Sequence, residues 1–448
     1  FRFTNQQLLC TSAIVMGICN IITMYSHSMP VLVVACFIAG IAKIQGTFEC
    51  MSNIQLWITP KRDFAVFFPV LHIILLTAIE GGGWLAAWMG HHFTWEMMHV
   101  FTVATMLFVL LTQMVLCRPF CPMPNRFSLK GTDWQGALLI CVTMLLVSYI
   151  FVYGDYYRWF ANRHIRMVGA FTLILAGLTL HRLIHNRYPY VELKLLKCRN
   201  VVPILIVTTL AELAFGAEHT LEEILYTEVI GLEELTKECQ YLWVLPGMFL
   251  GIALDLYWLK LQKWKVWKLI GIAFLSIFAY ALLMYTTLGM GVNIEQYRLA
   301  IMLRGFGYGI LAPTLMWALN ESVPSLEQFF MGLFVFNIVH MYLGGAMGYG
   351  FYTTIFSHFL SEDMVHYGRQ LTLTKLDLSH FNFGEFMGGD YLHSMMLVAI
   401  KQVYGYVIWF SLFLASIFLL CDIPAVRTNI RKVPRWPVYA IEYLAGRR

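Results

Sequence analysis

Charged residues are scarce in this sequence, and their scarcity decides the broad class of the protein. Asp, Glu, Lys and Arg make up only 13% of the 448 residues, whereas 59% are hydrophobic. Soluble globular chains carry about 25% charged residues and about 45–50% apolar ones. The apolar excess is larger than a water-soluble core can bury. The composition therefore argues against a soluble enzyme, a nucleic-acid-binding protein and a disordered scaffold.

Several catalytic motifs are also absent from the sequence. It has no Walker loop, which leaves ATP-driven transport without support, and neither His-Glu-x-x-His nor Gly-x-Ser-x-Gly, which weakens the case for an intramembrane hydrolase. Most of the ten cysteines lie inside apolar runs, and the isolated Cys117-x3-Cys121 has no further metal ligands nearby. We therefore predict no disulfide framework, no metal site, no cofactor and no enzyme activity.

The sequence contains many long apolar runs. They come in blocks of about 18–25 residues with few charges, the length that a helix needs to cross a hydrocarbon layer of about 30 Å. About twelve transmembrane helices are predicted, at residues 8–24, 31–59, 64–89, 95–117, 135–152, 167–183, 201–230, 235–259, 266–288, 297–319, 329–356 and 391–420. The sequence thus predicts an all-α polytopic membrane protein that is surrounded by lipid.

Lysine and arginine are distributed unevenly between alternate loops. With an even number of spans, both termini share one side, and the loops and tail of that side hold about 20 Lys and Arg residues against 7 on the other. Because cytoplasmic loops retain an excess of Lys and Arg, we expect both termini to be cytoplasmic. The same bias accounts for the formal net charge of +5. The segment 358–390 is too polar to span and is predicted to be external.

Two polar breaks divide the chain. Residues 118–132 and 185–200 are basic linkers, and a single hydrophobic hairpin, 133–184, lies between them. We therefore predict three parts: an N-terminal bundle with four spans (1–117), an extra hairpin with its linkers (118–200) and a C-terminal six-helix bundle (201–448).

Several short motifs carry a resemblance to a known family. They are the linker from Pro189 to Asn200, Asp133-Trp134-Gln135-Gly136, Gly154 with Trp159, the run from Arg304 to Gly309 with Pro313, the run from Gly344 to Gly348, and Ile44-Gln45-Gly46. With these motifs in this order, the chain resembles the fourteen-span drug:proton antiporter branch of the major facilitator superfamily. The linker is the most specific of them.

The resemblance implies both a fold and a function. It implies the major facilitator superfamily fold, with two six-helix bundles separated by an extra hairpin and two further spans before Phe1. It also implies export of amphipathic or cationic small molecules in exchange for protons across a bacterial inner membrane. Some members work with a periplasmic adaptor and an outer-membrane channel, and the segment 358–390 could dock such a partner.

Two features depart from the family pattern. Ala42 stands where the fourth helix of the family usually carries an Arg, and the Gly-Pro-x-x-Gly-Gly of the fifth helix is reduced to Gly82-Gly83-Trp84-Leu85-Ala86-Ala87. Both changes affect residues implied in drug antiport and leave the fold undisturbed. The reduced fifth-helix motif slightly favours an importer or exporter of a metabolite on the same fold.

Ionisable residues inside the predicted spans are the candidates for function, because a charge near the bilayer centre is costly to keep there. In the N-terminal bundle, Glu80 lies beside Gly81 to Gly83, whose missing side chains leave room for a helix or a substrate. We predict Glu80 as a proton carrier. Lys43, in the second predicted span, is a candidate countercharge.

The predicted span 201–230 is the most unusual, since acids interrupt an otherwise apolar run. Glu212 and His219 are seven residues apart and share a helical face as an acid/imidazole pair. A carboxyl in such a place can take up and release a proton, and an imidazole does so near physiological pH. We predict Glu212, Glu218 and His219 as proton-coupling residues. The remaining acids of this segment are expected at the external water boundary: Glu222, Glu223 and Glu228.

Four further residues of the C-terminal spans complete the prediction. Arg304 is predicted as a countercharge, and Asn337, His340 and Lys401 are predicted to line the substrate cavity. Asp255 is expected to face the basic cluster at residues 260–268. We thus predict a proton-coupled secondary active transporter that works by alternating access. Two alternatives stay open: a metabolite transporter on the same fold, and a membrane scaffold or sensor that transports nothing.

Overall fold

The computed structural model describes residues 4–59, 63–116, 133–186, 189–198, 200–262, 265–289, 291–324, 326–373 and 390–421. These residues are almost entirely helical, and no strand occurs among them. Within them, eleven helical segments are long and apolar enough to cross a membrane. The prediction of an all-α polytopic membrane protein is therefore confirmed. Cys117 and Cys121, considered above as metal ligands, lie outside the described residues.

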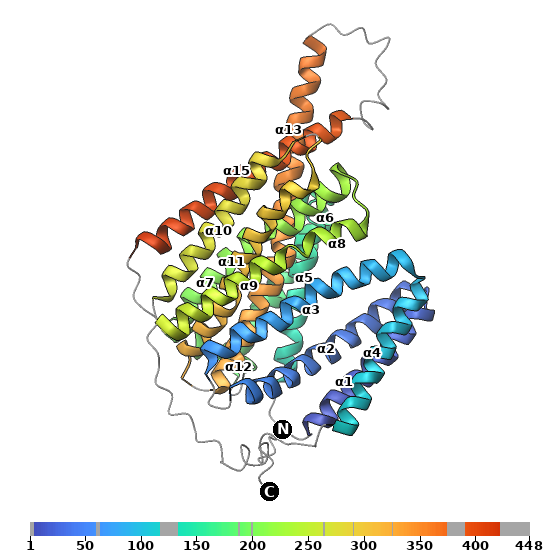
Figure 1. Ribbon diagram of the computed structural model, residues 1–448, viewed down its shortest axis with the longest axis vertical. Coiled ribbons are helices and arrows are strands. Elements are labelled where there is room, and N and C mark those ends of the chain that lie inside the picture. Colours follow the sequence, from blue (N-terminus) through green and yellow to red (C-terminus); the bar gives the residue numbers. More distant parts are fainter. Residues whose placement is uncertain are drawn as a thin grey trace. The chain divides into compact units, whose positions relative to one another are not determined.

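The described helices belong to two compact units, one before residue 131 and one from residue 131 to residue 431. The first contains α1 (Asn5–Tyr25), α2 (Met29–Ile58), α3 (Phe64–His92) and α4 (Trp95–Leu116). The hairpin predicted from the sequence lies in the second unit, together with the C-terminal helices (Figure 1).

In the first unit, α1 packs against both α2 and α4 (Figure 1). The Ser12 hydroxyl on α1 donates a hydrogen bond of 2.5 Å to the Ala42 carbonyl on α2. Asn20 on α1 shares a hydrogen bond with His99 on α4. Ala42 itself is buried. The position where the family resemblance implies an Arg is therefore a small-residue contact between two helices.

The hairpin consists of α5 (Trp134–Tyr153) and α6 (Arg163–His185). Asp133 caps α5, because its Oδ1 accepts a hydrogen bond of 3.0 Å from the Gly136 amide. The same carboxylate forms a 2.7 Å ion pair with Arg182 near the end of α6. Hydrogen bonding from Arg182 holds the pKa of Asp133 below its usual range. The Asp-x-x-Gly motif thus ties the two linker ends of the hairpin together.

The opposite end of the hairpin is fastened to α13 (Gly348–Leu373). Its turn places Arg158 and Trp159 at positive φ angles of 57° and 49°. In this conformation the indole Nε1 of Trp159 donates to the Thr354 hydroxyl at 2.9 Å. The Ser357 hydroxyl donates to Asp155 at 2.8 Å. The hairpin is therefore bonded to the C-terminal helices through side chains of its turn.

The other helices of the second unit are interrupted at three places by π-helical turns. The segment that begins with α7 (Val201–Ala217) continues as the π-helical turns η3 (Glu218–Glu222) and η4 (Ile224–Val229). The short α8 (Glu234–Tyr241) leads into α9 (Val244–Leu256), which is followed by the π-helical η5 (Tyr257–Gln262). The later elements are α10 (Val266–Thr287), α11 (Arg298–Ser322), α12 (Leu326–Ile338), the π-helical η7 (Val339–Met347), α13 and α15 (Asp390–Leu420).

The predicted span 329–356 corresponds to most of α12, all of η7 and the beginning of α13. From there α13 continues to Leu373 and projects beyond the neighbouring helices of its unit (Figure 1). The first half of the segment predicted to be external is therefore helical. Residues 374–389 lie outside the described part of the chain, and docking of an adaptor on this segment stays a prediction.

The helices α9 and α11 pack closely against each other inside the second unit. A Cβ atom on Gly309 of α11 would stand only 2.5 Å from the carbonyl oxygen of Met248 on α9, and one on Gly305 would likewise overlap the Val244 carbonyl. Small residues let helix backbones approach in this way within a membrane. The approach fixes the register of α11, and with it the buried position of Arg304, the neighbour of Gly305.

Candidate functional site

A buried ion pair lies inside the second unit. The Glu222 carboxylate, at the end of η3, contacts the Arg304 guanidinium on α11 through Oε2 and Nη1. The side chain of Glu222 is 0% exposed and that of Arg304 is 5% exposed. Each side chain compensates the other, because a single charge buried in this place without a partner would be costly.

Two tyrosines complete the surroundings of the Glu222 carboxylate. The Tyr280 hydroxyl on α10 donates to Glu222 Oε1 at 2.5 Å, and the Tyr404 hydroxyl on α15 lies 3.0 Å from that of Tyr280. Both tyrosines are fully buried. The carboxylate therefore has a charged partner on one oxygen and a chain of hydroxyls on the other.

Three further aromatic rings form a contiguous row that begins at Arg304. The guanidinium carbon of Arg304 lies 5.7 Å from the ring centroid of Tyr241 on α8. Tyr226 packs edge-on against both Tyr241 and Tyr297, with centroid distances of 5.9 Å and 6.3 Å. The hydroxyl of Tyr226 is buried and has no hydrogen-bond partner in the described part of the chain. The pair is thus enclosed by rings that keep bulk water away from it.

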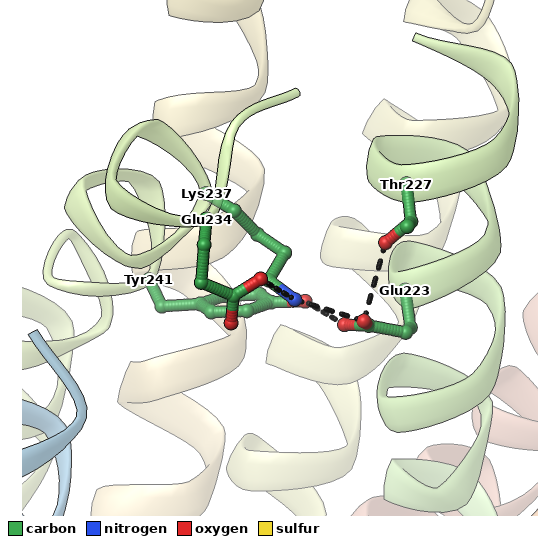
Figure 2. A network of polar contacts seen from close by, with 5 residues as sticks. All are labelled: Glu223, Thr227, Glu234, Lys237 and Tyr241. Atoms are coloured by element: carbon green, nitrogen blue, oxygen red, sulfur yellow. Dashed lines mark hydrogen bonds and ion pairs between the residues drawn. The ribbon is translucent and has the colours of Figure 1, made fainter. Parts of the chain in front are cut away.

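A second ionic cluster begins at the next residue along the chain. Figure 2 shows Lys237 between two carboxylates: its Nζ lies 2.8 Å from Glu223 Oε1 and 2.9 Å from Glu234 Oε2. The hydroxyl of Thr227 donates to Glu223 Oε1 at 3.2 Å, and that of Tyr241 lies 3.5 Å from Glu223 Oε2. Tyr241 therefore contacts both this cluster and Arg304.

A separate acid/imidazole pair joins α7 to η7. The Glu212 carboxylate contacts His340 Nδ1, and the two side chains are 13% and 27% exposed. Gly344 makes room for this contact, because a Cβ atom there would lie only 3.0 Å from Glu212 Cδ. The sequence predicts both residues but does not predict that they meet. The side chains of Glu218 and His219, which were also predicted as proton-coupling residues, lie outside the described residues.

The remaining predicted residues are distributed over both units. Glu80 is half-buried on α3 and Lys43 is exposed on α2, both in the first unit. In the second unit Asn337 on α12 is half-buried, and Lys401 on α15 points its Nζ at the Tyr285 ring, 6.0 Å from the centroid. The roles given to these four residues stay predictions.

Two buried acids contradict the expectation from the sequence. Glu222 was expected at the external water boundary, yet it is fully buried against Arg304, whereas Glu228 is exposed. The physical reason is that the Glu222 carboxylate meets the Arg304 guanidinium and the Tyr280 hydroxyl inside the unit, and these partners compensate its burial. Asp255 was expected to face the basic cluster. It is fully buried, and its Oδ1 accepts a 2.5 Å hydrogen bond from Thr314 on α11.

Comparison with solved structures defines the class of this fold. The human organic anion transporter MFSD10 (TETRAN) matches over 92% of this chain and 77% of its own, with a TM-score of 0.55 and 13% identity. A mutant of the peptide transporter POT matches over 93% of this chain and 80% of its own, with a TM-score of 0.53 and 14% identity. The chain therefore has the all-α fold of the major facilitator superfamily. No protein-family model matches the sequence, and no curated protein matches it either.

Proposed function

We propose that this protein is a proton-coupled secondary active transporter that exports amphipathic or cationic small molecules. The observation that carries the proposal is the Glu222–Arg304 pair, buried completely among membrane-spanning helices of a transporter-type fold. Ionisable groups are rare in such a position because of their cost, and they commonly mark proton relays and substrate paths.

The pair responds to a proton in a defined way. A proton on Glu222 removes the negative charge that compensates Arg304, so the conformation with both side chains buried becomes less stable. A conformation in which Arg304 finds another anion or water is then favoured. Proton binding can drive transport only through such a difference in affinity between two conformations. Tyr280, which donates to Glu222 Oε1, holds the carboxylate in place between these events.

The Glu212–His340 pair is proposed as a second proton-binding point. Unlike Glu222, both of its side chains are partly exposed, and each can exchange a proton without a large rearrangement. Imidazole changes its charge near physiological pH, which suits this exchange. Glu80, Glu218 and His219 remain further candidates for proton coupling, and Lys43 for a countercharge. Asn337 and Lys401 remain candidates for substrate contact, together with His340 itself.

The orientation and surroundings of the transporter are proposed from the sequence. The Lys and Arg distribution supports cytoplasmic termini. The resemblance to the drug:proton antiporters supports a bacterial inner membrane and a cationic or amphipathic substrate. It also supports an adaptor with an outer-membrane channel as partners, for which the segment 358–390 is the proposed docking element.

Reconstituted vesicles test this proposal. Purified protein is placed in proteoliposomes with an imposed proton gradient, and transport of the cationic dye ethidium is followed by fluorescence. We expect transport that collapses with an uncoupler. Glu222→Gln, which imitates the protonated acid, should abolish gradient-driven transport while keeping dye exchange at equal pH. Glu228→Gln is the matched control, because Glu228 is an exposed acid in the same segment and its loss should change neither readout.

Other outcomes distinguish the alternatives. Proton-driven transport that survives unchanged in Glu222→Gln would remove this pair from the mechanism. Uncoupler-sensitive transport of a metabolite but of no dye would favour the metabolite transporter. A folded protein that moves no compound tested under any gradient would favour the scaffold.

A further inference from the structure

In the ionic cluster of Figure 2 the lysine is buried and its two carboxylate partners are largely exposed. Lys237 is only 8% exposed, whereas its partners Glu223 and Glu234 are 47% and 65% exposed. A lysine on a short helix at the end of a bundle would normally extend its ammonium group into water. Here the ammonium is turned inward against Glu223. The cluster therefore holds α8 against the start of η4.

Tyr241 connects this cluster to the buried pair. It lies one helical turn beyond Lys237 on α8, so the two side chains share a face of that helix. Its hydroxyl reaches Glu223, and its ring lies against the guanidinium of Arg304. The ring also covers Tyr226, the fully buried residue beside the pair. Any movement of α8 away from Glu223 therefore takes the Tyr241 ring off Arg304.

The chain that leads into α8 is suited to such a movement. Gly231 adopts a φ of +70°, a conformation that other residues reach only with strain. It separates η4 from α8, and the Leu232 amide bonds back to the Tyr226 carbonyl at 2.8 Å. The contacts of Lys237 and Tyr241 thus lie on a short helix that a single turn joins to the preceding span.

We propose that α8 is the gate that controls access to the Glu222–Arg304 pair from the side predicted to be external, and that Lys237 is its latch. While Lys237 holds Glu223, the Tyr241 ring covers Arg304 and keeps water from Glu222. Release of Lys237 lets α8 turn about Gly231 and exposes the pair. The role of this gate in transport rests on the proposed function. Its opening is a change in the access of water and reagents to the pair, and this access is measured without any transport assay.

A thiol placed under the gate measures this access. Tyr226→Cys puts a reporter directly beneath the Tyr241 ring, and its reaction with a membrane-impermeant maleimide is followed by peptide mass spectrometry. The native Cys239, exposed on α8, is the internal standard for reagent and time. We expect the reporter to react about tenfold faster when Lys237→Met is added, which corresponds to about 1.4 kcal/mol in the opening equilibrium. The rate at Cys239 should stay the same.

Two companion variants separate the latch from general damage. Lys237→Arg keeps a cation between the carboxylates and should restore slow labelling. Arg298→Met is the matched control, because Arg298 forms a 3.1 Å ion pair with Glu295 and lies 5.0 Å from the Trp243 ring, with no contact to Glu223 among the described atoms. It should leave the reporter slow. Because Tyr226→Cys removes a large ring, hydrogen–deuterium exchange of residues 218–229 in the otherwise unaltered protein, with and without Lys237→Met, repeats the comparison.

The gate is overturned if Lys237→Met changes neither the labelling rate of the Tyr226→Cys reporter nor the hydrogen–deuterium exchange of residues 218–229. The labelling experiment and the transport experiment distinguish a failure of the gate from a failure of the proposed function. Faster labelling in Lys237→Met together with unchanged proton-driven transport in Glu222→Gln keeps the gate and removes the coupling role of the pair. The opposite combination keeps the coupling role and removes the gate.

Discussion

Glu222 and Glu223 are consecutive in the chain, yet one is fully buried against Arg304 while the other is half-exposed against Lys237. The two acids point in different directions from one π-helical region, and each has a basic partner on a different helix. Tyr241 lies against both pairs. The Tyr241 side chain therefore links the buried pair of Glu222 to the half-exposed pair of Glu223. Three predictions concern the Glu222–Arg304 pair and two other contacts of the second unit.

The first prediction concerns the cost of breaking the buried pair. Arg304→Met leaves Glu222 as a buried charge without its cation, so we expect a loss of about 3–5 kcal/mol in the free energy of unfolding. The double variant Glu222→Gln/Arg304→Met leaves no buried charge and should recover much of that loss. Denaturation in mixed detergent micelles measures both. Glu228→Gln should stay within about 0.5 kcal/mol of the unaltered protein. Equal values for Arg304→Met and Glu228→Gln would show that the pair contributes no such energy.

The second prediction concerns the space that the Glu212–His340 contact needs. Gly344→Ala places a Cβ against the Glu212 carboxyl, whereas no described atom stands within 4 Å of a Cβ on the next residue, Gly345. Gly344→Ala should therefore displace Glu212 and cost about 1–3 kcal/mol, as overpacking does. Gly345→Ala is its matched control and should be close to neutral. Thermal unfolding in detergent checks the difference, and a neutral Gly344→Ala would contradict the contact as described.

The third prediction concerns pH and the hairpin. Because Arg182 lowers the pKa of Asp133 in the folded protein, the ionised carboxylate stabilises the fold above the unfolded pKa, which is near 3.9. That stability is complete at neutral pH and is lost as the pH falls through the lower, folded pKa. Asp133→Asn should therefore unfold more easily than the unaltered protein at pH 7, and the difference should shrink below about pH 4.

The control for this pH effect is a double-variant cycle. Arg182→Met should destabilise the protein at neutral pH to a similar extent, and adding Asp133→Asn should cost little more, since the two residues act through one contact. Unfolding midpoints recorded across the pH range test this. Additive losses would mean that Asp133 acts through its helix cap alone, and a difference that persists at low pH would refute the charge effect.

The local sequence predicted those features that depend on hydrophobicity and on short motifs. Apolar runs of bilayer length predicted the helices, because only a helix satisfies its own backbone hydrogen bonds in lipid. The Asp133-x-x-Gly136 motif marks a real helix cap, since cap and glycine are three residues apart and need no distant partner. Arg304 and His340 were selected singly, because a charge inside a span is visible in the sequence alone, and Glu212 was paired with His219 by helical spacing, whereas its carboxylate meets His340.

The tertiary structure decided the partners. Arg304 meets Glu222, and Glu212 meets His340, across separations of 82 and 128 residues. No rule of helical periodicity connects such positions. The π turns after Ala217 also rotate the later acids away from the faces that α-helical spacing assigns to them. The chain by itself thus determined that acids and bases would be buried in membrane helices. Which ones compensate one another was decided by helix packing, because the cost of an unpaired charge is relieved only by a neighbour in space.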